Sequence, residues 1–232
     1  MLMETIISTR KLFTHIPRSK HIEPLEQINT DSGRFYKGPT GVLYPSVTTV
    51  TGIMNKHAIK VWRESVGEEE ANRITKKATS RGTRVHQLCE DYINNAPLSE
   101  KSTIIDLEAF IPLMKIIDEN IDNVHMQEER LYSDHLQMAG TVDCIAEYAG
   151  KLAIIDFKTA RKPKLKEYIT NYFCQATAYA IMYEELFGIS IPRLVIMISV
   201  DNEPPQVFFE KRDNWIDKLM EVREQYRKQY NG

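Results

Sequence analysis

Two aspartates and one lysine lie in neighbouring apolar segments that a short turn would join. Asp143 belongs to the first segment, and Asp156 and Lys158 belong to the second. If residues 149 and 150 form the turn of an antiparallel hairpin, Asp143 lies opposite Asp156, with Cβ atoms about 5 Å apart. Lys158 then points to the same face, because side chains alternate along a strand. A bulged loop is the alternative to this turn, and a slip of one residue would scatter the three groups.

This cluster is typical of a site for a hard divalent cation. Opposed carboxylates repel each other, more strongly beside an apolar wall, so a positive group is expected between them. Lys158 is one candidate and Mg²⁺ is the other, with Asp143, Asp156 and the carbonyl oxygen of Phe157 as its ligands. The alternative is a surface strand whose acids face water. We favour the cation site, because both strands are apolar on both faces, as covered strands usually are.

Two adjacent glutamates upstream offer a further acid. Glu128 and Glu129 lie in an expected strand, and alternation directs one of them toward the cluster. We favour Glu129, which stands two residues before Leu131. A solvated position at a sheet edge is the alternative for either glutamate.

A basic run follows the cluster directly. Residues 158–166 hold five basic residues in nine, among them Arg161, Lys162 and Lys164. The run is either a loop that binds phosphate groups beside the metal or an ordinary solvated loop.

Two expected helices carry further polar candidates. Gln175 and Tyr179 are four residues apart and share a helix face, so they either reach into the site or form an ordinary packing pair. His86 flanks the apolar stripe of an earlier helix. Taken alone, a histidine in that position is more often a structural residue than a metal ligand.

The elements that position these residues follow from hydrophobic periodicity, which changes from helical to a period of two near residue 123. The order predicts an α/β (α+β) fold with a mixed central β-sheet flanked by helices. We divide a single domain, 1–232, into an N-terminal extension with a hairpin at 1–57, a helical part at 58–122, a catalytic core at 123–212 and a C-terminal helix at 213–232. We expect a hairpin at 34–44, helices at 58–65, 68–94, 104–121, 166–187 and 215–230, and strands at 124–158, 194–200 and 206–209.

Composition excludes several classes of protein. The chain has 232 residues, 30 basic and 32 acidic, so any polyanion site must concentrate its basic groups locally. Three cysteines without a CxxC pair argue against a disulfide framework, a structural zinc site and an iron–sulfur cluster. No apolar run is long enough to span a membrane. Phosphate-loop and dinucleotide-binding glycine motifs are absent from the sequence, which argues against an activity driven by nucleotide hydrolysis.

These pieces, taken in order, resemble the PD-(D/E)xK nuclease superfamily and its RecB-like exonuclease branch. No single motif is specific, but five in the family's order are strong. Segments 44–48 and 150–159 also resemble the mitochondrial genome maintenance exonucleases and related phage exonucleases. The matching motifs are Gly82-Thr83-x-x-His86, Glu129 before a strand, Gly140-Thr141-Val142-Asp143, Asp156-Phe157-Lys158-Thr159 and Gln175-x-x-x-Tyr179.

The resemblance implies a restriction-endonuclease-like core and a role for each matched residue. Asp143, Asp156 and the Phe157 carbonyl would bind the metal together with His86. Lys158 would orient or deprotonate the attacking water, and Glu129 would be an outer acid. The residues expected to line the site or contact DNA are Gln175, Tyr179, Arg81, Arg161, Lys162 and Lys164. Cas4 proteins are also similar, but their cluster needs four cysteines, so we expect no iron–sulfur cluster here.

The expected function is that of a DNA exonuclease that depends on Mg²⁺ or Mn²⁺. It would act on single-stranded DNA or DNA ends in replication, recombination or repair, with proteins of those processes as partners and without a membrane. A structure-selective endonuclease and a non-catalytic DNA-binding module are the alternatives. Residues 1–20 resemble an import signal only faintly, so we expect the cytoplasm of a bacterial or phage-infected cell rather than a mitochondrion.

Overall fold

A computed structural model describes residues 10–230 and confirms the mixed central sheet. Its five strands follow the order β4-β5-β6-β7-β8. β6 and β7 run parallel, and every other neighbouring pair is antiparallel. The strands are β4 (Ile121–Ser133), β5 (Met138–Tyr148), β6 (Lys151–Ala160), β7 (Arg193–Val200) and β8 (Gln206–Lys211).

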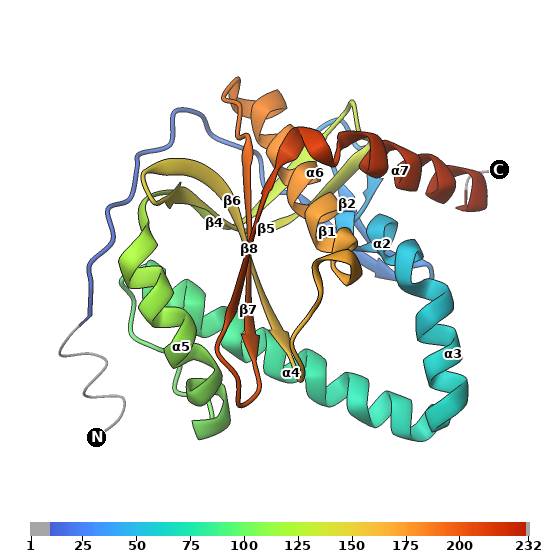
Figure 1. Cartoon of the computed structure of the whole chain (residues 1–232). Coiled ribbons are helices and arrows are strands. Elements are labelled where there is room, and N and C mark those ends of the chain that lie inside the picture. Colours follow the sequence, from blue (N-terminus) through green and yellow to red (C-terminus); the bar gives the residue numbers. More distant parts are fainter. Residues whose placement is uncertain (1–9, 231–232) are drawn as a thin grey trace.

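Helices cover both faces of this sheet, and α5 and α6 lie on opposite sides of the strands (Figure 1). The alternation of β6 explains this arrangement. Ile154 packs into a core with α6, α7 and α2, whereas Ile155 packs on the other face with α4 and α5. The helices are α2 (Val47–Thr51), α3 (Lys56–Val66), α4 (Glu68–Ile93), α5 (Ile104–Asn120), α6 (Thr170–Phe187) and α7 (Ile216–Tyr230).

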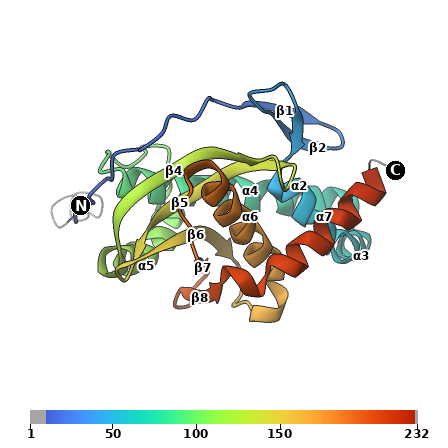
Figure 2. The same cartoon turned by 90° about the horizontal axis from the view of Figure 1, so that it is seen from above.

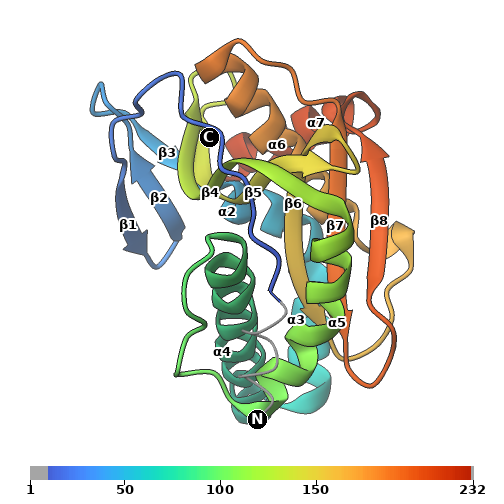
Figure 3. The ribbon, with the colours of Figure 1, turned by 90° about the vertical axis from the view of Figure 1, so that its left-hand side faces the viewer.

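A small N-terminal sheet lies beside the ends of β4 and β5 (Figure 3). It comprises β1 (Glu26–Thr30), β2 (Gly33–Lys37) and β3 (Leu43–Pro45), all antiparallel. The expected hairpin at 34–44 is therefore present, with an additional strand before it. A bridge between Ser46 and Ala139 joins the small sheet to β5.

The chain before β1 extends along β4, as Figure 2 shows from above. His15 forms a parallel bridge with Val124, and the N–H of Ile16 donates to the carbonyl of Val124 at 2.8 Å. The segment discussed above as an import signal, residues 1–20, lies partly outside the described residues. No helix within 10–230 combines the length and the apolar character that a membrane crossing requires.

The predicted hairpin between β5 and β6 has the predicted register. Tyr148 lies opposite Lys151, and the ladder continues in step to Cys144 and Ile155. Ala149 and Gly150 both have left-handed backbone angles, with φ of 48° and 70°, as a tight two-residue turn requires.

Candidate metal centre and surrounding cavities

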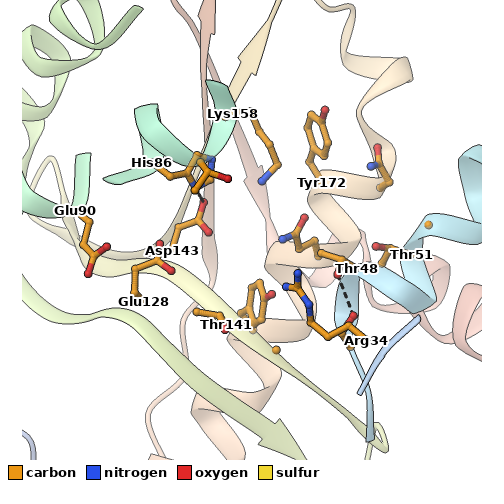
Figure 4. A pocket seen from close by; sticks show the side chains of 18 of the residues that line it. Arg34, Thr48, Thr51, His86, Glu90, Glu128, Thr141, Asp143, Lys158 and Tyr172 are labelled. Carbon is orange, nitrogen blue, oxygen red and sulfur yellow. Dashed lines mark hydrogen bonds and ion pairs between the residues drawn. The ribbon is translucent and has the colours of Figure 1, made fainter. Parts of the chain in front are cut away.

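Three side chains from three different elements converge at the end of the β5–β6 ladder. They are His86 on α4, Glu128 on β4 and Asp143 on β5. Each offers one ligand atom, and these atoms all lie within 4.8 Å of one another. Figure 4 shows the three side chains pointing into one cavity of about 540 Å³. One nitrogen and two carboxylate oxygens at this spacing suit a divalent cation.

Asp143 reaches this position because β5 and β6 separate just beyond their last ladder pair. Its carboxylate oxygen Oδ2 accepts a hydrogen bond of 2.9 Å from the N–H of Phe157 and lies 3.5 Å from Nδ1 of His86. Asp143 and Asp156 therefore do not form the ladder pair that the sequence predicted. A side chain has replaced a backbone carbonyl as the hydrogen-bond acceptor, so the strands diverge and open the cavity between them.

The glutamate at the centre is Glu128, which corrects the preference for Glu129. Gln127 and Glu129 both pair with β5, but Glu128 between them does not, and its φ is 46°. This left-handed residue turns its side chain into the cavity. Glu129 points away and forms an ion pair with Arg18. A backbone irregularity of this kind leaves no signal in the alternation of residue types.

Desolvation and neighbouring acids raise the pKa of Glu128 to about 8. Its side chain is open to solvent within the cavity but enclosed by protein on its other sides. This desolvation is the main cause, and the negative charges of Asp143 and Glu90 add to it. Burial likewise lowers the pKa of His86, which favours the neutral imidazole that can bind a metal. A bound cation would offset both the repulsion between the carboxylates and the cost of burying their negative charge.

Lys158 and Asp156 form a largely buried ion pair beside the three ligand atoms. Lys158 also donates to the carbonyl oxygen of Phe157 at 3.4 Å, and its ammonium lies 5.2 Å from the ring centroid of Tyr172. Burial disfavours the charged amine, but the carboxylates of Asp156 and Asp143 outweigh it and raise the pKa of Lys158. Asp156, predicted as a metal ligand, is thus not one of the three clustered side chains but the partner of Lys158.

Asp156 is almost fully buried, with 2% of its surface exposed. Both of its carboxylate oxygens contact the ammonium of Lys158 at 2.5 Å. Burial raises the pKa of Asp156, and the positive charge of Lys158 opposes that shift. The nitrogen of His86 and the carboxylate oxygens of Glu128 and Asp143 fit the donor set of a divalent cation, and Asp156 neutralises the lysine beside them.

Gln175 and Tyr179 line the same cavity, as their spacing allowed. Both are buried on α6, which approaches β5 closely at Gly140. A Cβ atom at Gly140 would lie 2.8 Å from Oη of Tyr179 and 3.2 Å from a methyl group of Val47. Glycine at this position therefore lets α6 bring Tyr179 to the site.

The predicted basic residues line a second cavity of about 850 Å³. Its aromatic wall, Tyr172, belongs to both cavities. Arg81 lies here too, in an ion pair with Asp201. The sequence did not single out two further cations from α4. The basic residues of this cavity are Arg73, Lys77, Arg81, Arg161, Lys162 and Lys164.

One wall of the first cavity comes from the N-terminal region, which the sequence had not assigned to the site. Figure 4 shows Arg34 and Thr48 on the side opposite to His86 and Glu90. The motif around Thr48 supported the family resemblance, but no spacing pointed to Arg34. The lining residues that were missed include Arg34, Tyr36, Ser46, Thr48 and Thr51 from the N-terminal region, and Gln87, Glu90, Asn171 and Tyr172 from later elements.

Comparison with known proteins identifies the family of the chain. The family model described as the PD-(D/E)XK nuclease superfamily matches residues 56–227. Human mitochondrial genome maintenance exonuclease 1 is 26% identical over 207 residues, which cover 80% of this chain and 60% of the human protein. The Xenopus tropicalis protein of that name is 27% identical over 171 residues, which cover 68% and 49%. The chain thus spans only about half to three-fifths of these relatives.

Among solved structures, the crystal structure of SSO0001 is similar at 11% identity, with a TM-score of 0.37. The match covers 76% of this chain and 74% of that one. A likeness of this size has no bearing on function.

Proposed function

Because this chain belongs to the PD-(D/E)XK nuclease superfamily, we propose that it is a divalent-metal-dependent deoxyribonuclease that acts as an exonuclease. The observation that carries the proposal is the convergence of His86, Glu128 and Asp143 within 4.8 Å, beside the partly buried Lys158. The relatives named exonucleases support the same reading. The reaction is hydrolysis of a phosphodiester bond.

The metal would be held by His86, Glu128 and Asp143, beside the ion pair of Asp156 with Lys158. Mg²⁺ and Mn²⁺ both accept such ligands. When bound, the cation supplies Lewis-acid chemistry: it neutralises phosphate charge and lowers the pKa of water.

Lys158 is the residue that we expect to orient the attacking water. Its ammonium lines the cavity and is held between the carboxylate of Asp156 and the ring of Tyr172. A protonated amine at this position orients the water by hydrogen bonding and stabilises negative charge as the phosphate is attacked. The buried amide of Gln175, which lines the same cavity, is a second group that can orient it.

The second cavity would bind the DNA backbone. Its basic residues surround a space that meets the first cavity at Tyr172. Phosphate groups on either side of the scissile bond would lie along this basic surface, and binding would weaken with salt because counterions are released. Although the chain is close to neutral overall, several of its basic residues gather in the cavity where we propose that DNA binds.

The test is incubation with end-labelled single-stranded and double-stranded DNA in Mg²⁺, in Mn²⁺ and in EDTA. We expect release of short products with either metal and none with EDTA. Circular single-stranded and duplex DNA serve as matched substrates without ends. Cleavage of circles would establish an endonuclease instead, and binding without cleavage in any metal would establish a DNA-binding module.

A further inference from the structure

The cavity wall formed by the N-terminal region contains an arginine without a partner. Arg34 lines the metal cavity from β2, outside the matched residues 56–227. Its guanidinium group has neither an ion pair nor a hydrogen bond to any residue within 10–230. By contrast, Arg81 is paired with Asp201 and Arg84 with Asp106. Arg34 is exposed, so water can solvate its guanidinium group, and the side chain is available to a ligand that enters the cavity.

The backbone of Arg34 is fixed, although its side chain is free. Its N–H donates to Oγ1 of Thr49 at 3.1 Å, and its carbonyl accepts from the N–H of Ser46 at 2.8 Å. Gly33 before it has a φ of 136°, and a Cβ atom there would lie 2.6 Å from the Thr49 side chain. Glycine is therefore required at position 33, and the close contact with α2 sets the direction of Arg34.

The charge of the cavity indicates what Arg34 would bind. The carboxylates of Glu90, Glu128 and Asp143 line the cavity, yet none of them pairs with Arg34. In the proposed reaction, the carboxylates bind the metal ion, so they do not neutralise the guanidinium group of Arg34. The remaining anion is the substrate, and a guanidinium group presents a planar fork of donors that matches two phosphate oxygens.

We propose that Arg34 binds the non-bridging oxygens of the phosphodiester group next to the scissile one. The inference rests on the proposed nuclease function. Arg34 lies across the cavity from His86 and Glu90, so it faces the backbone of a bound strand from the side opposite to that wall (Figure 4). The N-terminal sheet is then part of the substrate site rather than an accessory to the fold.

The experiment pairs variants of the protein with variants of the substrate. Oligonucleotides would carry one neutral methylphosphonate, placed in turn at each linkage around the cleaved bond. The proteins are the unsubstituted chain, Arg34→Ala, Arg34→Lys and Lys37→Ala, the last being a control for a cation on the same strand. All four are compared for kcat/KM, with circular dichroism and Mn²⁺ affinity as checks that fold and metal site are intact.

We expect Arg34→Ala to lower kcat/KM on unmodified DNA about tenfold or more, the scale of a lost charged hydrogen bond. The methylphosphonate next to the cleaved bond should impair the unsubstituted chain and Lys37→Ala by a similar factor, yet have no added effect on Arg34→Ala. Arg34→Lys should be intermediate. If Arg34→Ala cleaves normally, or stays sensitive to that methylphosphonate, the inference is overturned while the nuclease function stands. If the unsubstituted chain cleaves no DNA, both fall.

Discussion

The carboxylate of Asp143 accepts a hydrogen bond of 2.9 Å from the backbone N–H of Phe157. The contact lies just past the last ladder pair of β5 and β6, formed by Cys144 and Ile155. One side chain therefore both ends the pairing of two strands and supplies a ligand atom to the cavity that opens there. The Asp143 carboxylate therefore has both a structural role and a role in the candidate metal site.

This double role makes Asp143→Asn an informative variant. The amide oxygen can still accept from the N–H of Phe157, so we expect a thermal unfolding midpoint close to that of the unsubstituted chain. The lost negative charge should abolish most cleavage and weaken Mn²⁺ binding, as measured by calorimetry. Normal cleavage by Asp143→Asn would remove Asp143 from the metal site.

The two adjacent glutamates provide a matched pair of variants. Glu128→Gln removes a ligand atom from the cluster, so we expect Mn²⁺ affinity to fall about tenfold or more and cleavage to fall with it. Glu129→Gln only breaks an ion pair with Arg18 outside the cavity and should leave both unchanged. The reverse result would restore Glu129 as the functional acid.

Lys158→Ala should separate binding from cleavage. We expect at least a hundredfold loss of kcat, because a positioned group that handles the attacking water contributes on that scale. DNA affinity in Ca²⁺ and affinity for Mn²⁺ should persist, since Lys158 is not among the clustered ligand atoms. Retained kcat in this variant would show that Lys158 has only the structural role of neutralising Asp156.

The basic cavity predicts a change in the salt dependence of DNA binding. Replacing Lys162 and Lys164 by alanine should lower the slope of log affinity against log salt by about one for each phosphate group that the variant no longer binds. The control is Lys151→Ala, at the turn on the opposite end of β6. An unchanged slope in the double variant, measured by fluorescence anisotropy with labelled DNA, would contradict the assignment of this cavity to DNA.

Asp106 predicts how stability depends on pH. Burial alone would raise its pKa, but hydrogen bonds from Arg84 and from Thr103 at the start of α5 lower it. The carboxylate therefore stabilises the folded state fully above the pKa of the unfolded chain, near 4. This contribution is lost as pH falls through the lower pKa of the folded state.

We expect Asp106→Asn to reduce the free energy of unfolding by about 2 kcal/mol at neutral pH, because charged hydrogen bonds are lost. The difference from the unsubstituted chain should shrink as pH falls below about 4, in urea titrations at a series of pH values. A difference that is constant with pH would mean that the pKa of Asp106 is the same in the folded and unfolded states.

Short-range patterns in the sequence predicted much of the fold. Alternating residues around the 149–150 turn indicated the correct register, and the helix expected to end at residue 187 does end there, before a Gly188 with a left-handed φ of 71°. The same patterns predicted that Gln175 and Tyr179 share a face, which lines the cavity. These features depend on neighbours within a few turns or one hairpin, where periodicity carries the information.

Features that depend on backbone irregularity or distant contacts were not predictable in this way. The left-handed φ of Glu128 reverses the outward and inward positions that alternation assigns. The ion pair of Asp156 with Lys158 and the hydrogen bond from Phe157 to Asp143 both depend on how the strands diverge. Arg34 lines a cavity whose opposite wall comes from a distant part of the chain. No periodic pattern links the position of Arg34 in the sequence to the residues of that wall.

The ring of Tyr172 is a partition common to two compartments. It lines both cavities, and the ammonium of Lys158 lies 5.2 Å from its centroid. A group that lies against Tyr172 in the basic compartment would therefore touch the same ring that stands beside the amine of Lys158. The two compartments are neighbours through one aromatic side chain.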